Sequence, residues 1–140
     1  MFDRPIKSIM ERKRFLTAPP QTTVSDAARL MASHNAGAVL VVEGEELVGI
    51  FTERDVVFRV IAKDLESATT RLETVMTPSP LTLGPTRPYG QALLLMHEHG
   101  FRHVPVVEDG RAIGIVSSRN AMDPDLEDFV SEQRRREQYR

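Results

Sequence analysis

The chain contains an internal repeat, in which residues 26–55 align without a gap on residues 91–120 at an offset of 65 positions. Eleven of the 30 aligned pairs are identical, among them Gly49 with Gly114 and Arg54 with Arg119. Such self-similarity indicates one supersecondary unit built twice, because a unit too small to bury its apolar face alone can bury it against a second copy. The sequence therefore predicts two related halves packed on each other.

The first half shows the order helix, strand, strand, helix. Ser25 is expected to cap a helix that continues to about His34, because its apolar residues recur at helical spacing. The short apolar runs 38–42 and 47–51 flank four polar residues and predict a β-hairpin. A second helix is expected over residues 53–61.

The second half repeats this order, with a helix predicted over residues 88–99 and strands over residues 103–107 and 112–116. Pro88 would occupy the first turn of its helix, where proline is tolerated. The polar stretch 63–80 is expected to connect the halves.

The last part of the chain predicts one more helix, which begins near a proline, is acidic first and is basic at its end, as the helix dipole favours. Leu126, Phe129 and Val130 would lie on one side of it, so this helix is expected to pack on the pair of halves or on a partner chain. The predicted division is 1–72 for the first half, 73–122 for the second and 123–140 for the tail.

Composition excludes several classes of function. Lys and Arg number 18 against 20 Asp and Glu, so the net charge of −2 gives no overall attraction to nucleic acid or to anionic membranes. The chain has no cysteine, and hence no disulfide and no thiolate site. Its first residues are charged, and no apolar run approaches the length of a membrane span, so a cytoplasmic location is expected.

The repeated motifs resemble the cystathionine-β-synthase (CBS) domain family, and the chain resembles a stand-alone tandem CBS pair, or Bateman module, over residues 9–122. The first copy carries "TTVSDAARLM", "GAVLVV" and "LVGIFTERD". The second copy carries "VMTPSPLTL", "MHEHGFRHVPVV" and "RAIGIVSSRN". The resemblance implies an α/β (α+β) fold of two pseudo-twofold-related motifs, each a small sheet packed with two helices, plus the C-terminal helix.

The resemblance also implies a regulatory module without catalytic chemistry or catalytic cofactor. It would bind an adenine nucleotide, AMP or ATP first and NAD or S-adenosylmethionine next, in clefts between the motifs. A homodimer and an unidentified downstream protein are the expected partners. The alternative is a structural dimerisation or interaction module whose clefts are vestigial.

The junction after each second strand is the candidate binding element. Thr52 ends a buried strand and opens a helix, with Asp55 three residues later, so a hydroxyl, helix N-terminal amides and a carboxylate converge. A carboxylate can accept from both hydroxyls of a ribose, in charge-assisted bonds of about 1.5–3 kcal/mol each. The same spacing also fits a capping box, and both roles can hold in the empty protein.

In the second copy Ser117 and Asn120 replace Thr52 and Asp55, which departs from the family's pattern. Neutral hydrogen bonds contribute nearer 0.5–1.5 kcal/mol, so this site is predicted to bind on the order of tenfold or more weakly. One stronger and one weaker nucleoside site are therefore expected.

The resemblance supplies the further residues of each site, since adenosine held by one motif would lean on the other. The stronger site would comprise Thr52, Arg54, Asp55, Thr77, Pro80, Leu81, Phe101, Arg102 and His103. The weaker site would comprise Lys13, Phe15, Leu16, Thr17, Ala36, Gly37, Ala38, Ser117, Arg119 and Asn120.

Other motifs give weaker indications of function. His97 and His99 point to different faces of one helix, which argues against a shared metal ion. The three adjacent arginines near the C-terminus stand in acidic surroundings, which argues against nucleic acid. No nucleophile is paired with a base, because the histidines are expected in other elements than Ser117 and Ser118. The sequence thus predicts a chain that is not an enzyme.

Overall fold

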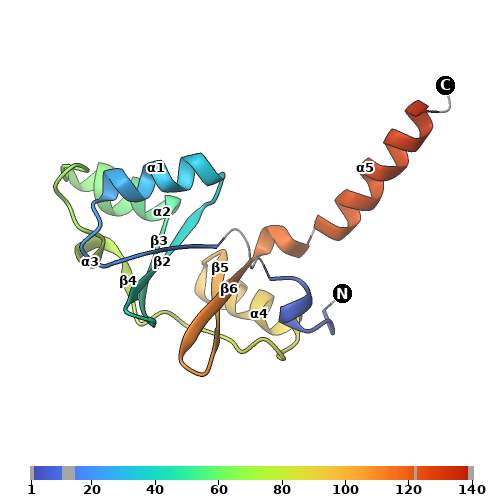
Figure 1. Cartoon of the computed structure of the whole chain (residues 1–140), viewed down its shortest axis with the longest axis horizontal. Helices are drawn as coiled ribbons and strands as arrows, with labels where there is room; N and C mark the ends of the chain where they lie inside the picture. Colours follow the sequence, from blue (N-terminus) through green and yellow to red (C-terminus); the bar gives the residue numbers. More distant parts are fainter. Residues whose placement is uncertain (1, 11–14, 122, 139–140) are drawn as a thin grey trace.

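The computed structural model describes residues 2–10, 15–121 and 123–138. It confirms the predicted α+β fold, in which two β-hairpins, each with its own helices, lie side by side (Figure 1). The elements in chain order are η1 (Ile6–Ser8), β1 (Leu16–Ala18), α1 (Val24–His34), β2 (Ala38–Glu43), β3 (Glu46–Thr52), α2 (Glu53–Asp55), η2 (Val56–Val60), η3 (Ile61–Lys63), α3 (Leu72–Val75), β4 (Thr77–Pro78), α4 (Tyr89–His99), β5 (His103–Glu108), β6 (Arg111–Ser117), η4 (Ser118–Ala121) and α5 (Asp123–Gln138).

The repeat is visible in the strand register. In the β2–β3 hairpin Ala38 lies opposite Thr52, and in the β5–β6 hairpin His103 lies opposite Ser117, so both pairs differ by the repeat offset of 65. Each hairpin has a bulge at the same relative position. Both predicted hairpins are confirmed, and their strands extend one residue further at each turn.

The four-residue turn predicted for the first hairpin is too long. Glu43 pairs with Glu46, so only Gly44 and Glu45 form the turn. The second hairpin turns at Asp109 and Gly110, where Asp109 adopts φ 51° and the glycine 79°. Tight two-residue hairpin turns require such positive φ values, because these match the twist of the strands.

Two predictions about helix starts need correction. Thr23, not Ser25, caps α1, because Thr23 is the last extended residue and its Oγ1 accepts from the Asp26 N–H at 3.2 Å. Ser25 is the second residue of α1, with its Oγ 3.0 Å from that of Ser67. Pro88 is the cap residue of α4, so it precedes the first helical turn where it was expected.

The helical path predicted over residues 53–61 is confirmed, and it is irregular. α2 is followed by a π-helical turn, η2, and by the 3₁₀ turn η3. A π turn widens the helix by one residue and often occurs at functional positions. Here it begins directly after Asp55.

The stretch 63–80 is more than a connection, which corrects its polar interpretation. Leu72 and Val75, spaced by three positions, bury one side of α3 in the core of the first motif. β4 then pairs with β3. A side chain on Gly49 of β3 would place its Cβ 2.3 Å from Met76 Sδ, so this close approach requires glycine.

The core of each motif includes residues from a short segment that lies in the chain directly before the other motif. Ile6 and Met10 pack in the core of the second motif, with Tyr89 and the buried face of α4. Leu72 and Val75 pack in the first core, as described above. The division at residue 72 stays a prediction. The segment at residues 6–10 packs in the second core and the segment at residues 72–75 packs in the first, and these are called the exchanged segments.

A third apolar cluster lies between the motifs. Ala38, Leu40 and Ile50 of the first hairpin meet Ile115 of the second. These residues occupy the strand faces turned away from the two cores. The two motifs therefore bury one continuous face against each other, as the repeat predicted.

The predicted C-terminal helix is confirmed as α5, which extends away from both hairpins (Figure 1). The side chain of Phe129 is 58% exposed, so packing of this residue on the pair is not what the structure shows. Leu126 and Val130 lie outside the residues whose side chains are described. Packing of α5 on a partner chain stays a prediction. None of the described helices combines the length and apolar character needed to cross a bilayer.

Candidate ligand-binding cleft

The two strand-to-helix junctions are built alike. Asp55 Oδ2 accepts from the Thr52 N–H at 2.8 Å and from its Oγ1 at 3.2 Å. Asn120 Oδ1 accepts from the Ser117 N–H at 2.7 Å and from its Oγ at 3.3 Å. Asp55 and Asn120 are the buried polar residues of the described chain. The capping role predicted for the first junction is confirmed, because Thr52 Oγ1 also accepts from the Asp55 N–H.

The carboxylate at the first junction also meets an arginine. Arg59, one turn further along the helical path, places Nε 3.4 Å from Asp55 Oδ1. Its Nη1 donates to the Val75 carbonyl oxygen at 3.2 Å. Both carboxylate oxygens of Asp55 therefore have partners within the chain.

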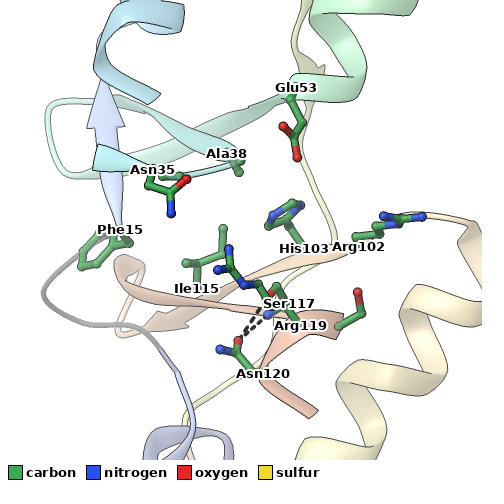
Figure 2. Close-up of a pocket in the computed structure, with 13 residues that line it drawn as sticks. Phe15, Asn35, Ala38, Glu53, Arg102, His103, Ile115, Ser117, Arg119 and Asn120 are labelled. Atoms are coloured by element: carbon green, nitrogen blue, oxygen red, sulfur yellow. Dashed lines mark hydrogen bonds between the residues drawn. The ribbon is translucent and has the colours of Figure 1, made fainter. Parts of the chain in front are cut away.

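A cavity of about 390 Å³ opens beside the second junction (Figure 2). Its volume falls in the range of roughly 300–1,000 Å³ that is usual for small-molecule sites. Both motifs supply its walls: Phe15, Asn35, Ala36, Gly37, Ala38 and Glu53 from the first, and Arg102, His103, Ile115, Ser117, Ser118, Arg119 and Asn120 from the second.

Most residues predicted for the Asn120 site line this cavity, namely Phe15, Ala36, Gly37, Ala38, Ser117, Arg119 and Asn120. Leu16 is buried in the first core, and Thr17 is exposed on β1. Lys13 lies outside the described residues.

The residues predicted for the Asp55 site are more dispersed. Arg102 and His103 line the cavity beside Asn120. Arg54 lies over the ring of Phe58, with its guanidinium carbon 4.4 Å from the ring centre. The other predicted residues lie outside the cavity lining: Thr52 and Asp55 in the capping box, Thr77 in β4, Pro80 half-buried, Leu81 exposed, and Phe101 stacked on His99.

The sequence missed four lining residues, Asn35, Glu53, Ile115 and Ser118. Asn35 is the left-handed C-cap of α1, at the position that Gly100 holds after α4. Glu53 follows Thr52 at the first junction. The repeat identifies both positions, but it does not show which side chains turn toward the other motif.

Glu53 and His103 face each other across the cavity (Figure 2). Burial lowers the pKa of His103 below its usual 6.5, and the Arg102 guanidinium adds to this, while Glu53 partly opposes it. The imidazole is therefore neutral at neutral pH. A Cβ on Gly37 would lie 3.0 Å from Glu53 Oε1 and 3.5 Å from His103 Nε2, so glycine keeps the space between them open.

His103 lies in β5, in another element than Ser117 and Ser118, as predicted. It is nevertheless Ser117's partner in the hairpin register and lines the same cavity. The hydroxyl of Ser117 contacts Asn120 Oδ1. Among the described residues no group of three His, Asp or Glu side chains could hold a metal ion.

A second cavity of about 450 Å³ adjoins the first and shares five lining residues with it: Asn35, Ala36, Gly37, Glu53 and Arg119. Its other walls are mainly apolar and come from α1 and η2, among them Met31, Val56 and Val57. Glu53 and Arg119 thus lie at the boundary between the first cavity and the more apolar second cavity.

Comparison with known proteins identifies both halves of the repeat. The sequence model of the CBS domain matches residues 6–62 and 72–124. The meiotically up-regulated gene 70 protein of Schizosaccharomyces pombe is 42% identical over 68% of this chain and 13% of its own length. The CBS domain-containing protein YhcV of Bacillus subtilis is 36% identical over 72% of this chain and 71% of its own. The chain spans about a fifth or less of several other curated relatives.

Solved structures share the fold. An uncharacterized conserved protein from Pyrococcus horikoshii is 30% identical, with a TM-score of 0.82 over 89% of this chain and 94% of its own. The CBS domain pair of protein MJ0100, in complex with 5′-methylthioadenosine and S-adenosyl-L-methionine, is 26% identical, with a TM-score of 0.78 over 86% and 98%. PAE2072 from Pyrobaculum aerophilum, complexed with AMP, is 24% identical and matches in fold, with a TM-score of 0.77 over 84% and 89%.

Proposed function

Because the chain belongs to the CBS-domain family, we propose that it is a regulatory module that binds an adenine nucleotide in the cleft between its two motifs. AMP and ATP are the ligands expected first, followed by NAD and S-adenosylmethionine. The observation that carries this proposal is the cavity beside Asn120, whose walls come from both motifs. The adenosine ligands of the related MJ0100 pair support it.

The lining suggests how the ligand would lie. Asn120 and Ser117 stand at the end of a buried strand and can hydrogen-bond ribose hydroxyls. Arg119 and Arg102 supply positive charge for phosphates, with the planar donors that suit phosphate oxygens. Phe15 and Ile115 supply apolar atoms for a base.

The same geometry provides a route to regulation. A ligand that contacts both motifs binds more tightly to one relative placement of them than to another, and only such a difference can shift a conformational equilibrium. A downstream protein would detect that shift. No reaction is part of the proposal, and the hydroxyl of Ser117 in the cleft contacts an amide oxygen rather than a base.

Isothermal titration with AMP, ATP, NAD and S-adenosylmethionine tests this function. At least one of them is expected to bind more tightly than millimolar. Arg119→Ala should weaken AMP or ATP binding about tenfold, as the loss of a charge-assisted bond implies. Arg111→Ala, which removes an exposed ion pair with Glu45 at the far end of the hairpin, is the matched control. Affinities weaker than millimolar for all four ligands would contradict the proposal.

We also propose that the chain forms a homodimer. Val57, Phe58 and Ile61 are each more than half exposed, at 55%, 54% and 62%. They form an apolar helical face, defined by these three residues, on the outer side of η2 and η3. Residues of this kind at neighbouring helical positions are typical of an interface between copies of one chain. This face also supports the alternative function, an interaction module without ligand.

A further inference from the structure

Arg59 ties together the two sides of the first junction. Its Nε is 3.4 Å from Asp55 Oδ1, and its Nη1 donates to the Val75 carbonyl oxygen at 3.2 Å. Val75 ends α3, directly before the segment that the sequence assigned to the Asp55 site. Arg59 therefore bridges the carboxylate of Asp55 and the last residue of α3.

The carboxylate of Asp55 has little capacity left for a ribose. Oδ2 accepts from the backbone and the hydroxyl of Thr52, while Oδ1 faces the guanidinium of Arg59. Burial does not distinguish the two junctions, since Asp55 is 7% exposed and Asn120 4%. Neither cavity described above includes Asp55 in its lining.

The second copy has an amide at the position of the carboxylate. The repeat offset of 65 aligns Asp55 with Asn120. A neutral amide attracts a guanidinium far less than a carboxylate does. The copy without the carboxylate–arginine pair is the one whose junction lines the cavity of about 390 Å³.

We infer that Arg59 determines which junction takes the nucleotide, by occupying Asp55 and confining binding to the cleft beside Asn120. The inference rests on the proposed function. It reverses the ranking that the sequence favours, because a carboxylate is the better ribose acceptor only while it is free to accept. Ligand at the Asp55 junction must first displace Arg59 from both of its partners.

The stoichiometry of nucleotide binding tests this inference. Isothermal titration with AMP and with ATP is expected to give one site per wild-type chain and two per Arg59→Ala chain. The added equivalent should disappear in the double variant Arg59→Ala with Asp55→Ala. Arg29→Ala is the matched control, since it removes another helical arginine–aspartate pair, exposed and 3.1 Å long.

Conversion of the second junction gives a second, independent test. Asn120→Asp should strengthen binding at the cleft about tenfold, by giving the ribose a charged acceptor. Arg59→Met keeps most of the apolar stem and replaces Arg59→Ala if circular dichroism shows that the alanine variant is unfolded.

The outcomes separate this inference from the proposed function. One site in both the wild type and Arg59→Ala, or two sites in the wild type, would overturn the role of Arg59 and leave the nucleotide module standing. Binding only in Arg59→Ala would support the role of Arg59 and overturn the cleft beside Asn120. No binding in any variant would overturn both.

Discussion

Ionisation of His103 should change the free energy of unfolding. Its pKa is lowered by burial in the cleft, where it faces Glu53 and has Arg102 and Arg119 nearby. The unfolded chain therefore binds a proton more readily than the folded one, and stability is lost as the pH falls below about 6.5 and on through the lower folded pKa.

Denaturant unfolding from about pH 8 to pH 5 measures this effect. The wild type is expected to lose more free energy of unfolding toward acid than His103→Gln does. His97→Gln, which changes an exposed histidine on α4, should keep the pH slope of the wild type. Equal slopes for the wild type and His103→Gln would show that burial of the imidazole carries no such penalty.

Gly37 should control the width of the cleft. Gly37→Ala would place a methyl group 3.0 Å from Glu53 Oε1 and 3.5 Å from His103 Nε2. We expect AMP or ATP affinity to fall about tenfold, since a well-fitted ligand tolerates little lost space, while the unfolding midpoint changes little because Glu53 is an exposed, flexible side chain. In Gly84→Ala, the control, the nearest atom is Val107 O at 4.0 Å. Unchanged affinity in Gly37→Ala would place the ligand elsewhere.

At the scale of elements, the exchanged segments make a prediction about local stability. Ile6 and Leu72 are both fully buried. Ile6 lies in the core of the second motif and Leu72 in the core of the first. Ile6→Ala and Leu72→Ala should each cost about 2–5 kcal/mol, the usual range for a truncated core aliphatic. Leu94→Ala, at a residue 55% exposed on α4, should cost far less.

Hydrogen exchange distinguishes the two cores. Ile6→Ala should weaken the protection of amides in α4 and β5, and Leu72→Ala that of amides in α1 and β2. The reverse pattern, or equal loss in both motifs, would show that the exchanged segments do not belong to the cores that they contact.

Much of this element order could be predicted from the sequence, for identifiable reasons. The repeat at an offset of 65 predicts both hairpins, because two short apolar, β-branched runs separated by polar turn residues have few alternatives. The sequence missed the role of α3, since two apolar residues in a polar stretch give a weak signal. It also missed Glu53 as a lining residue and the Asp55–Arg59 pair, because a side chain's partner depends on how two distant elements pack.

At the scale of the whole molecule, the apolar helical face predicts the oligomeric state. Phe58→Glu places a charge among Val57, Phe58 and Ile61 and should convert a dimer into a monomer, as sedimentation or light scattering would report. Phe129→Glu, at an exposed aromatic residue on α5, is the control. Dissociation by Phe129→Glu instead would assign the interface to α5, and a monomeric wild type would contradict the homodimer.

The exchange of Ile6 and Met10 for Leu72 and Val75 has a consequence for any attempt to isolate half of this protein. A fragment that ends at residue 71 would retain Ile6 and Met10 with nothing to cover them and would lack the two residues that close its own interior. Its complement would have the opposite deficit. The smallest unit that can fold by itself is therefore the pair of motifs. Transplanting it into another polypeptide would require both motifs in their original order.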